Sequence, residues 1–289
     1  MDYANKPVLI TGCSSGIGWR AAQLLHERGY PVIATARSEE GVARLRDLGV
    51  DAQFLEVTDY AQVDALLDHI QTRYGKLYGV FNNAGYSQVG AAEDLPDEAL
   101  REQFDTNFFA VTYITNQVLK RFMRPQGDGR IIQNSSVMGI AAMSFRAAYC
   151  ASKHALEAYT DALRQELALT DSNIRVGLVE PGPIVSRIRQ NKQKFFLKYI
   201  EPIMHDSPHQ RAYETMHKGL AMTGRIPFTL EPDAVVKDVI DILESQRPKP
   251  RYYQTRLTYI MGFIKRISSS RGYDKVALKI TRKETGLDK

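Results

Sequence analysis

Residues 8–18 read VLITGCSSGIG, an apolar triplet that runs directly into a loop containing three glycines. A helical pattern follows over Ile17–Arg28 and stops before Gly29, a residue type that commonly ends helices. Glycines in such a loop permit a tight turn and let the backbone approach a pyrophosphate, while the helix N-terminus offers free N–H groups to negative charge. This order of elements predicts a nucleotide-binding strand–loop–helix unit. The alternative is an unrelated glycine-rich turn, which would not need a strand before it and a helix after it.

Short apolar runs alternate with helical patterns beyond this unit. Asp59 can cap a helix that runs to Tyr74, and Asp97 can cap another that runs to Met123. Alternation of this kind is typical of an α/β protein in which crossover helices join parallel strands. The apolar runs are Val8–Ile10, Val32–Ala34, Phe54–Val57, Gly79–Phe81, Ile131–Gln133 and Val176–Val179.

Composition places the chain among ordinary globular enzymes. It has 289 residues, of which 44% are hydrophobic, enough for a sizeable core. Cys13 and Cys150 are too few for a disulfide framework, so a reducing compartment is expected. Neither a signal peptide nor a run of about 18 apolar residues is visible. We therefore expect one domain over residues 1–289, located in the cytoplasm.

Positive charge is concentrated near the C-terminus. Residues 247–289 hold 12 Lys and Arg against 3 Asp and Glu, whereas the rest of the chain holds 26 basic and 30 acidic residues. No helix-turn-helix, zinc or base-stacking signature accompanies this charge, so no nucleic acid is expected as a partner. We treat residues 251–289 as a basic extension.

Within that extension, one segment has apolar residues at helical spacing, with Lys265 and Arg266 beside them. Such a helix could make peripheral contact with an acidic membrane surface. It could instead cover the active site or a partner subunit. The apolar positions are Leu257, Ile260, Met261 and Ile264.

Arg37 lies shortly after the second apolar run, in the sequence Ala36-Arg37-Ser38. Enzymes specific for NAD usually carry an acidic residue there, which binds the ribose 2′-hydroxyl. The planar guanidinium of arginine suits a 2′-phosphate, although a loop arginine is ordinarily just solvated. The sequence therefore favours NADP (NADPH) over NAD.

Tyr149 and Lys153 are four residues apart at the start of a helical pattern, which places both side chains on one face. Among the 15 tyrosines, only Tyr149 has a lysine four residues later. A phenol with a pKa of ~10 is a poor acid–base group at neutral pH, but a nearby ammonium and a positive nicotinamide would lower that pKa. The alternative is a surface tyrosine that packs over the aliphatic stem of a lysine.

Several motifs together resemble the short-chain dehydrogenase/reductase (SDR) family over about residues 7–186. The phrases LYGVFNNAG, SSVMG and EPGPI, with Arg37, are most similar to the branch of NADPH-dependent aldehyde reductases, retinol dehydrogenases and 17β-hydroxysteroid dehydrogenases. The resemblance implies a Rossmann-type, doubly wound parallel sheet of about seven strands in the order 3-2-1-4-5-6-7, with helices on both faces. The motifs are TGCSSGIG at 11–18, NNAG at 82–85, Asn107, Ser136, Tyr149-x-x-x-Lys153 and Pro181-Gly182.

The same resemblance assigns roles to four residues. Ser136 would polarise a carbonyl oxygen and Tyr149 would transfer its proton, while Lys153 would bind the nicotinamide ribose and Asn107 would position a relay water. No metal is expected, because no ligand spacing surrounds His154. Glu56 stands where many relatives carry aspartate. The implied cofactor contacts are Gly12, Ser14, Ser15, Gly16, Ile17, Gly18, Arg37, Glu56, Val57, Asn83, Ala84, Gly85, Tyr149, Lys153, Pro181, Gly182, Ile184 and Ser186.

We therefore expect an NADP(H)-dependent oxidoreductase that interconverts an apolar carbonyl compound, such as an aliphatic aldehyde, retinoid or steroid, and its alcohol. A catalytically weak protein that senses nicotinamide nucleotide on the same fold is the alternative. The resemblance also makes a homodimer or homotetramer plausible.

Residues 187–227 read as an insertion that could form either a lid over an apolar ligand or a packing helix. Its apolar residues are Phe195, Phe196, Leu197, Tyr199, Ile200 and Ile203.

Overall fold

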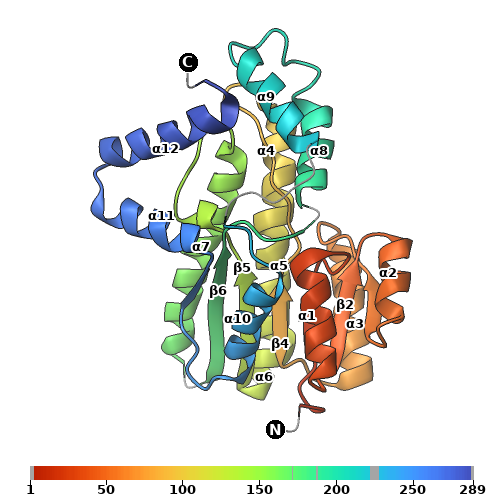
Figure 1. The fold of residues 1–289 in the computed structure, drawn as a ribbon. Coiled ribbons are helices and arrows are strands. Elements are labelled where there is room, and N and C mark those ends of the chain that lie inside the picture. Colours follow the sequence, from red (N-terminus) through yellow and green to blue (C-terminus); the bar gives the residue numbers. More distant parts are fainter. Residues whose placement is uncertain (1–2, 171, 187, 222–227, 288–289) are drawn as a thin grey trace.

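The computed structural model describes residues 3–170, 172–186, 188–221 and 228–287. Parallel strands form one seven-stranded sheet in the order β3-β2-β1-β4-β5-β6-β7, with helices on both faces (Figure 1). This confirms the predicted Rossmann-type fold and its strand order. The strands are β1 (Val8–Ile10), β2 (Val32–Ala36), β3 (Asp51–Phe54), β4 (Gly79–Asn82), β5 (Asp128–Asn134), β6 (Asn173–Pro181) and β7 (Arg251–Gln254).

Two hydrophobic cores lie on opposite faces of the sheet, because successive side chains of a strand point in opposite directions. In β1, Val8 and Ile10 join the core that includes α1 (Gly16–Glu27) and α10 (Asp233–Glu244). Leu9 joins the other core, with α3 (Tyr60–Tyr74) and α5 (Ala110–Val118). Burial on both faces explains why the central strands read as continuous apolar runs.

The two edge strands are the places where the sequence pattern misleads. The third strand was expected at Phe54–Val57, but β3 covers Asp51–Phe54. Leu55 and Val57, which attracted that prediction, are buried in the loop that follows. The edge strand β7 belongs to the sheet, although residues 251–254 were expected in the basic extension. Both edge strands are partly exposed, so their composition is more polar than that of a central strand.

Helix boundaries follow the capping signals with one exception. The Asp59 side chain caps α3, and Gly75 ends that helix in the left-handed region, as predicted. Asp97 was expected to be a cap, but Pro96 occupies the N-cap position and Asp97 lies in the first turn. Carboxylates there interact favourably with the helix dipole.

The helical run from Asp97 to Gln126 contains two π-helical segments. It consists of α4 (Asp97–Phe104), η1 (Asp105–Phe109), α5, η2 (Leu119–Met123) and α6 (Arg124–Gln126). The first π-helical segment contains the buried Asn107. Such segments often mark functional sites, because the extra residue redirects a side chain.

The insertion forms α8 (Ile188–Tyr199) and α9 (Gln210–Ala221), at the top of Figure 1. Its apolar side chains mostly pack on the protein, against the segment after β4 and against Tyr213, so the packing alternative describes them better than a lid. Residues 187 and 222–227 of the predicted insertion lie outside the described residues. Phe195, Phe196, Tyr199 and Ile200 are buried, whereas Leu197 and Ile203 are exposed.

Three further helices, α2 (Glu39–Arg46), α7 (Ala147–Ala168) and η3 (Val137–Gly139), lie around the candidate site. The helix α2 follows β2, and α7 carries Tyr149 and Lys153. The short η3 follows β5. Beyond β7, α11 (Arg256–Ile267) and α12 (Ser270–Thr285) project to one side of the molecule (Figure 1).

Candidate active site

The candidate site lies at the carboxyl edge of the sheet. Four segments follow the ends of β1, β4, β5 and β6, and parallel strands bring these ends to one edge. The four segments are residues 11–18, 83–85, 135–136 and 182–186. The helix α7 adds the remaining pair of predicted residues, so the fold gathers motifs that are far apart in the sequence.

The glycine loop packs tightly against two other segments. Gly12 has a φ of +71°, and a Cβ there would lie 2.8 Å from the Ala84 Cα. Gly16 has a φ of +60°, and its Cβ would lie 2.8 Å from the Ser186 Cβ. A Cβ on Gly18 would clash with the loop itself and with an asparagine amide. Only glycine therefore fits this loop in its observed shape.

Asn83, directly after β4, holds the glycine loop in place by hydrogen bonds. Its Nδ2 donates to the backbone oxygens of Thr11, at 2.9 Å, and of Gly12, at 3.0 Å. The Thr11 hydroxyl in turn accepts from the backbone N–H groups of Asn83 and Ala84, both at 3.0 Å. Asn83 was expected near a ribose, and the structure shows that its amide protons are used by the loop.

The first turn of α1 is suited to a pyrophosphate. Ser15 occupies the N-cap position, but its side chain makes no capping hydrogen bond. The backbone N–H groups at this helix end therefore have no side-chain cap from Ser15 and can serve an anion. Ser14 and Ile17 are half-buried in the same loop. This geometry fits the phosphates of a dinucleotide.

Asn107 links the segment after β4 to the helix that carries Tyr149. Its Oδ1 accepts from the Tyr86 N–H at 3.1 Å, and its Nδ2 donates to the Tyr86 oxygen at 2.9 Å and to the Ser152 Oγ at 3.3 Å. The Ser152 hydroxyl donates to the Tyr149 carbonyl at 2.8 Å. A Cβ on Gly85 would lie 3.1 Å from the Asn107 Oδ1, which explains a small residue there.

Lys153 is buried, and its Nζ donates to the backbone oxygen of Asn134 at 2.7 Å. Burial lowers the pKa of Lys153 to about 8, against the charge of Glu157, which raises it. The ammonium lies 6.0 Å from the centre of the Tyr149 ring. The predicted pair therefore shares one face of α7, as its spacing indicated.

Burial also governs Tyr149. It raises the pKa of the phenol to about 12, although a hydrogen bond with the Ser136 side chain lowers it. From the sequence we expected Lys153 and a positive nicotinamide to lower this pKa. In the protein itself burial outweighs the neighbours, so the phenol holds its proton at neutral pH. The Ser136 hydroxyl also accepts from the Met138 N–H at 3.1 Å.

Behind Lys153 lies a group of buried charges that the sequence reading missed. Arg251 lies 3.1 Å from the fully buried Glu180, 3.1 Å from Glu157 and 2.7 Å from Asp161. Burial and the adjacent Glu157 raise the pKa of Glu180 far above its usual value, although the Arg251 guanidinium beside it acts in the opposite direction. One signal was available: Glu157 follows Lys153 by one helical turn, and Glu180 interrupts an apolar strand.

Arg37 stands at the end of β2 with 51% of its side chain exposed. One guanidinium nitrogen lies 3.7 Å from the Glu56 carboxylate, which is itself 36% exposed. An exposed pair at that distance contributes little binding energy, so the guanidinium is available to another anion. Val57, next to Glu56, is buried in the second core and could offer only its backbone to a cofactor.

Contacts on both sides hold the loop after β6, residues 182–186, in place. The Gly182 N–H donates to the Gln254 oxygen at 3.0 Å, and a Cβ on Gly182 would overlap the Thr255 hydroxyl. Ile184 forms an isolated parallel bridge with Leu230. Together with the close approach of Ser186 to the glycine loop, these contacts fix residues 181–186 over the same edge.

Two other observations concern ligands. In the parts of the chain that the structure describes, no group of three or more metal-ligating side chains occurs, and the His154 ring contacts the Cys150 oxygen at 2.9 Å. Two surface recesses, of about 400 and 520 Å³, are lined by residues 275–282 and by residues 228–230 with 253–259. Ser136, Tyr149 and Lys153 line neither recess, whereas the second recess borders the loop after β6 through Leu230 and Gln254.

Comparisons with known proteins agree with this arrangement. Residues 6–195 match the family described as short chain dehydrogenase. The chain is 38% identical over 272 residues to the uncharacterized oxidoreductase YbbO of Escherichia coli (strain K12), covering 94% of this chain and 93% of that protein. It is 32% identical over 267 residues to retinol dehydrogenase 8 of Homo sapiens, covering 90% and 84%. A solved actinorhodin polyketide ketoreductase with NADPH has a TM-score of 0.69 and 29% identity, covering 88% and 97%.

The glycine loop generates one prediction. Gly12→Ala should abolish binding of both NADPH and NADH, because its Cβ meets the Ala84 backbone at 2.8 Å and displaces the loop. Gly75→Ala is a matched control, since Gly75 has a similar φ of +67° and nothing within 4 Å of an added Cβ. In urea unfolding, both variants should lose about 1 kcal/mol to left-handed backbone strain, and Gly12→Ala should lose more because of its clash with Ala84. Equal nucleotide affinity in fluorescence titrations of the two variants would contradict the proposed role of the loop.

The buried ammonium generates a second prediction. Because the pKa of Lys153 is lowered to about 8 in the folded protein, the unfolded chain binds an additional proton from about pH 8 to its ordinary pKa of ~10.4. The buried ammonium therefore destabilises the folded protein, and this cost falls as the pH rises across this window. The stability of wild type relative to Lys153→Met, from urea unfolding at several pH values, should increase from pH 8 to pH 10. A flat difference would show that the ammonium is not desolvated.

Proposed function

The chain belongs to the short-chain dehydrogenase/reductase family, and we propose that it is an NADP(H)-dependent oxidoreductase that interconverts an apolar aldehyde or ketone and its alcohol. The observation that carries this proposal is that the Ser136 and Tyr149 hydroxyls come together beside the buried Lys153, whose Nζ is held by the Asn134 carbonyl and lies 6.0 Å from the centre of the Tyr149 ring. These two hydroxyls stand at the sheet edge where the glycine loop accepts a dinucleotide. Such a pair can donate a proton to a carbonyl oxygen and stabilise the negative charge that develops on it.

In the reductive direction, the protein supplies the proton. A phenol is protonated at neutral pH, and burial keeps Tyr149 protonated by raising its pKa to about 12, so it can donate to a carbonyl oxygen as negative charge develops there. The Ser136 hydroxyl can stabilise the same oxygen with a second hydrogen bond. A bound nicotinamide supplies the hydride.

Lys153 assists the return of the proton. Its pKa of about 8 allows the ammonium to exchange a proton near neutral pH. The hydrogen bond to Asn134 holds Nζ in place, and its positive charge stabilises a phenolate on Tyr149 once the proton has left. The charge also favours contact with the hydroxyls of a nicotinamide ribose.

Arg37 supports a preference for NADP(H). It follows β2, where enzymes that use NAD commonly place a carboxylate. Its guanidinium is half exposed and only loosely paired with Glu56, which suits a 2′-phosphate. The solved ketoreductase named above also contains NADPH.

An apolar substrate agrees with the wall that follows Ser136. Val137 and Met143 are buried in a cluster with Met138 and with Met261 of α11. Thioethers pack well against irregular apolar groups. The similarity to a retinol dehydrogenase points to the same substrate class.

The catalytic role of Tyr149 is tested by Tyr149→Phe. The variant should reduce turnover with NADPH and medium-chain aldehydes, retinal or ketosteroids by about 10²–10⁴-fold, because the proton donor is lost. Its NADPH affinity should stay within about twofold, since a phenyl ring preserves the packing. Tyr159→Phe is the control on the same helix, where the hydroxyl donates to Asn116. An active Tyr149→Phe enzyme would refute the mechanism, and a wild type inactive on every substrate would favour a nucleotide sensor.

Cofactor choice is tested by Arg37→Asp. The Kd for NADPH should rise by about tenfold or more, because a charge-assisted hydrogen bond to the phosphate is replaced by repulsion. The Kd for NADH should stay the same or fall. Arg46→Asp makes the same change in net charge at the far end of α2 and controls for long-range effects. An unchanged NADPH-to-NADH preference in Arg37→Asp would exclude Arg37 from phosphate recognition.

A further inference from the structure

The helix α11 is apolar on two faces. Its inner face packs Leu257, Met261 and Ile264 into a cluster with residues 137–143. Its outer face carries four large apolar side chains in a row, at positions spaced like one side of a helix. In a helix that only covers a protein core, that outer face would be polar. The outer residues are Tyr259, Ile260, Phe263 and Ile267, with exposures of 60, 48, 64 and 65%.

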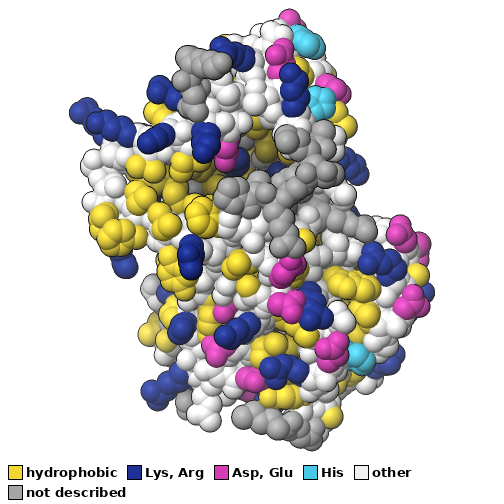
Figure 2. Space-filling model, viewed as in Figure 1, with side chains coloured by type: hydrophobic (Ala, Val, Ile, Leu, Met, Phe, Trp, Pro, Cys, Tyr) yellow, Lys and Arg dark blue, Asp and Glu magenta, His cyan; other side chains and the backbone are white. Residues whose placement is uncertain are grey.

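Figure 2 shows apolar side chains gathered over α11, with dark blue basic side chains near them. Single exposed apolar residues are common, but an adjacent group of this kind usually marks an interaction surface. We call these four residues the apolar stripe. The Tyr259 ring contacts the Tyr253 ring of β7, with centroids 5.4 Å apart, and all four side chains of the stripe are exposed in the single chain.

Basic residues surround the apolar stripe. Residues 256–287 contain eight Lys and Arg against two acidic residues, and one of these, Glu284, pairs with Arg146 at 2.7 Å. In the part of the chain that the structure describes, Lys265 and Arg266 form no ion pair. The flanking basic residues are exposed: Arg256, Lys265, Arg266, Arg271, Lys275 and Lys279.

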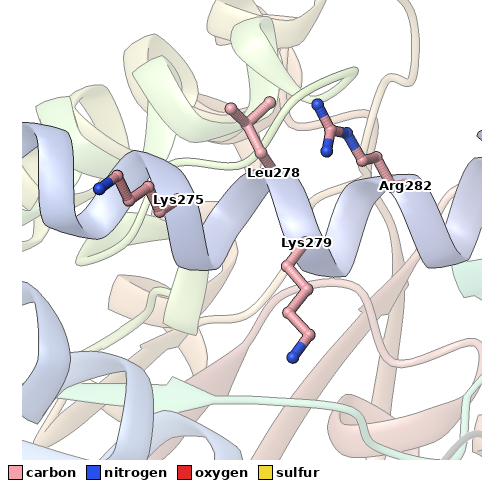
Figure 3. A pocket seen from close by; sticks show the side chains of 4 residues that line it. All are labelled: Lys275, Leu278, Lys279 and Arg282. Carbon is pink, nitrogen blue, oxygen red and sulfur yellow. The ribbon is translucent and has the colours of Figure 1, made fainter. Parts of the chain in front are cut away.

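The helix α12 extends the positive charge. Figure 3 shows three cationic side chains and a leucine on this one helix. They line a recess of about 400 Å³. Cations that are spread along a helix beside apolar side chains suit the phosphates of lipid headgroups better than one small anion. The four residues are Lys275, Leu278, Lys279 and Arg282.

We propose that α11 and α12 dock this protein on the surface of an anionic lipid bilayer. The apolar stripe enters the boundary between headgroups and acyl chains, and the flanking Lys and Arg bind the phosphates. Charge complementarity selects this occupant: a second copy of the chain would bring the same positive rim to the interface and be repelled. No helix of the described residues is long and apolar enough to cross a membrane, so the contact is peripheral.

The docking surface lies one helix away from the candidate active site. The inner face of α11 contacts the segment after Ser136, and the Tyr273 hydroxyl of α12 donates to the Ala142 oxygen at 2.7 Å. A substrate dissolved in the bilayer would therefore enter beside the wall that faces the reacting carbonyl. This consequence rests on the proposed function, whereas the docking itself does not.

Vesicle sedimentation of the full chain tests the proposal. We expect binding to vesicles of phosphatidylcholine and phosphatidylglycerol (3:1) and little binding to pure phosphatidylcholine. Phe263→Ser/Ile267→Ser should lose binding, and Lys265→Gln/Arg266→Gln should weaken it by about thirtyfold, because each cation near the surface contributes to the attraction. Leu169→Ser is the control, since Leu169 is 87% exposed at the end of α7, away from the stripe.

Three outcomes would overturn the proposal. The first is equal sedimentation of wild type and Phe263→Ser/Ile267→Ser with anionic vesicles, and the second is no sedimentation of wild type. The third is a dimer in analytical ultracentrifugation that Phe263→Ser/Ile267→Ser converts to a monomer, which would assign the stripe to a second copy. NADPH oxidation with a water-soluble aldehyde should be unchanged in all three variants, so loss of docking and loss of the proposed function are separable.

Discussion

The hydrogen bond from the buried Lys153 ammonium to the Asn134 carbonyl begins a continuous path through the site. The Asn134 side chain donates to the Asn83 Oδ1 at 2.9 Å, and Asn83 donates to the backbone of Thr11 and Gly12. One path therefore connects α7, β5, β4 and the loop after β1. A buried ammonium requires such a partner, because desolvation without compensation is costly. Asn134, whose carbonyl accepts from this ammonium, is thereby linked through Asn83 to the glycine loop.

Burial sets the protonation states at this edge of the sheet. It raises the pKa of Tyr149, lowers the pKa of Lys153 and, with Glu157, raises the pKa of Glu180. Each shift favours the neutral form. The result is a protonated phenol beside a lysine whose pKa lies near neutral pH, and Arg251 pairs with the acidic residues behind them.

Much of this could be predicted from the sequence, because the decisive signals are local. The loop at 11–18, the helix that carries Tyr149 and Lys153, and the strand order all follow from patterns within a few residues or from family resemblance. The edge strand β3 was misplaced, because partial exposure removes the apolar signal. The lid and packing readings of α8 could not be separated, since both require apolar residues at helical spacing. Roles that depend on distant partners, such as those of Asn134 and Arg251, are invisible in a single sequence.

A crystal structure of the protein with NADP and an unreactive carbonyl compound would test the account most directly. The account predicts that the Tyr149 Oη and the Ser136 Oγ both lie within about 3.2 Å of the carbonyl oxygen. It also predicts Lys153 Nζ beside the nicotinamide ribose. A carbonyl oxygen bound by other groups, with Tyr149 directed away from it, would contradict the assignment of Tyr149 as the proton donor.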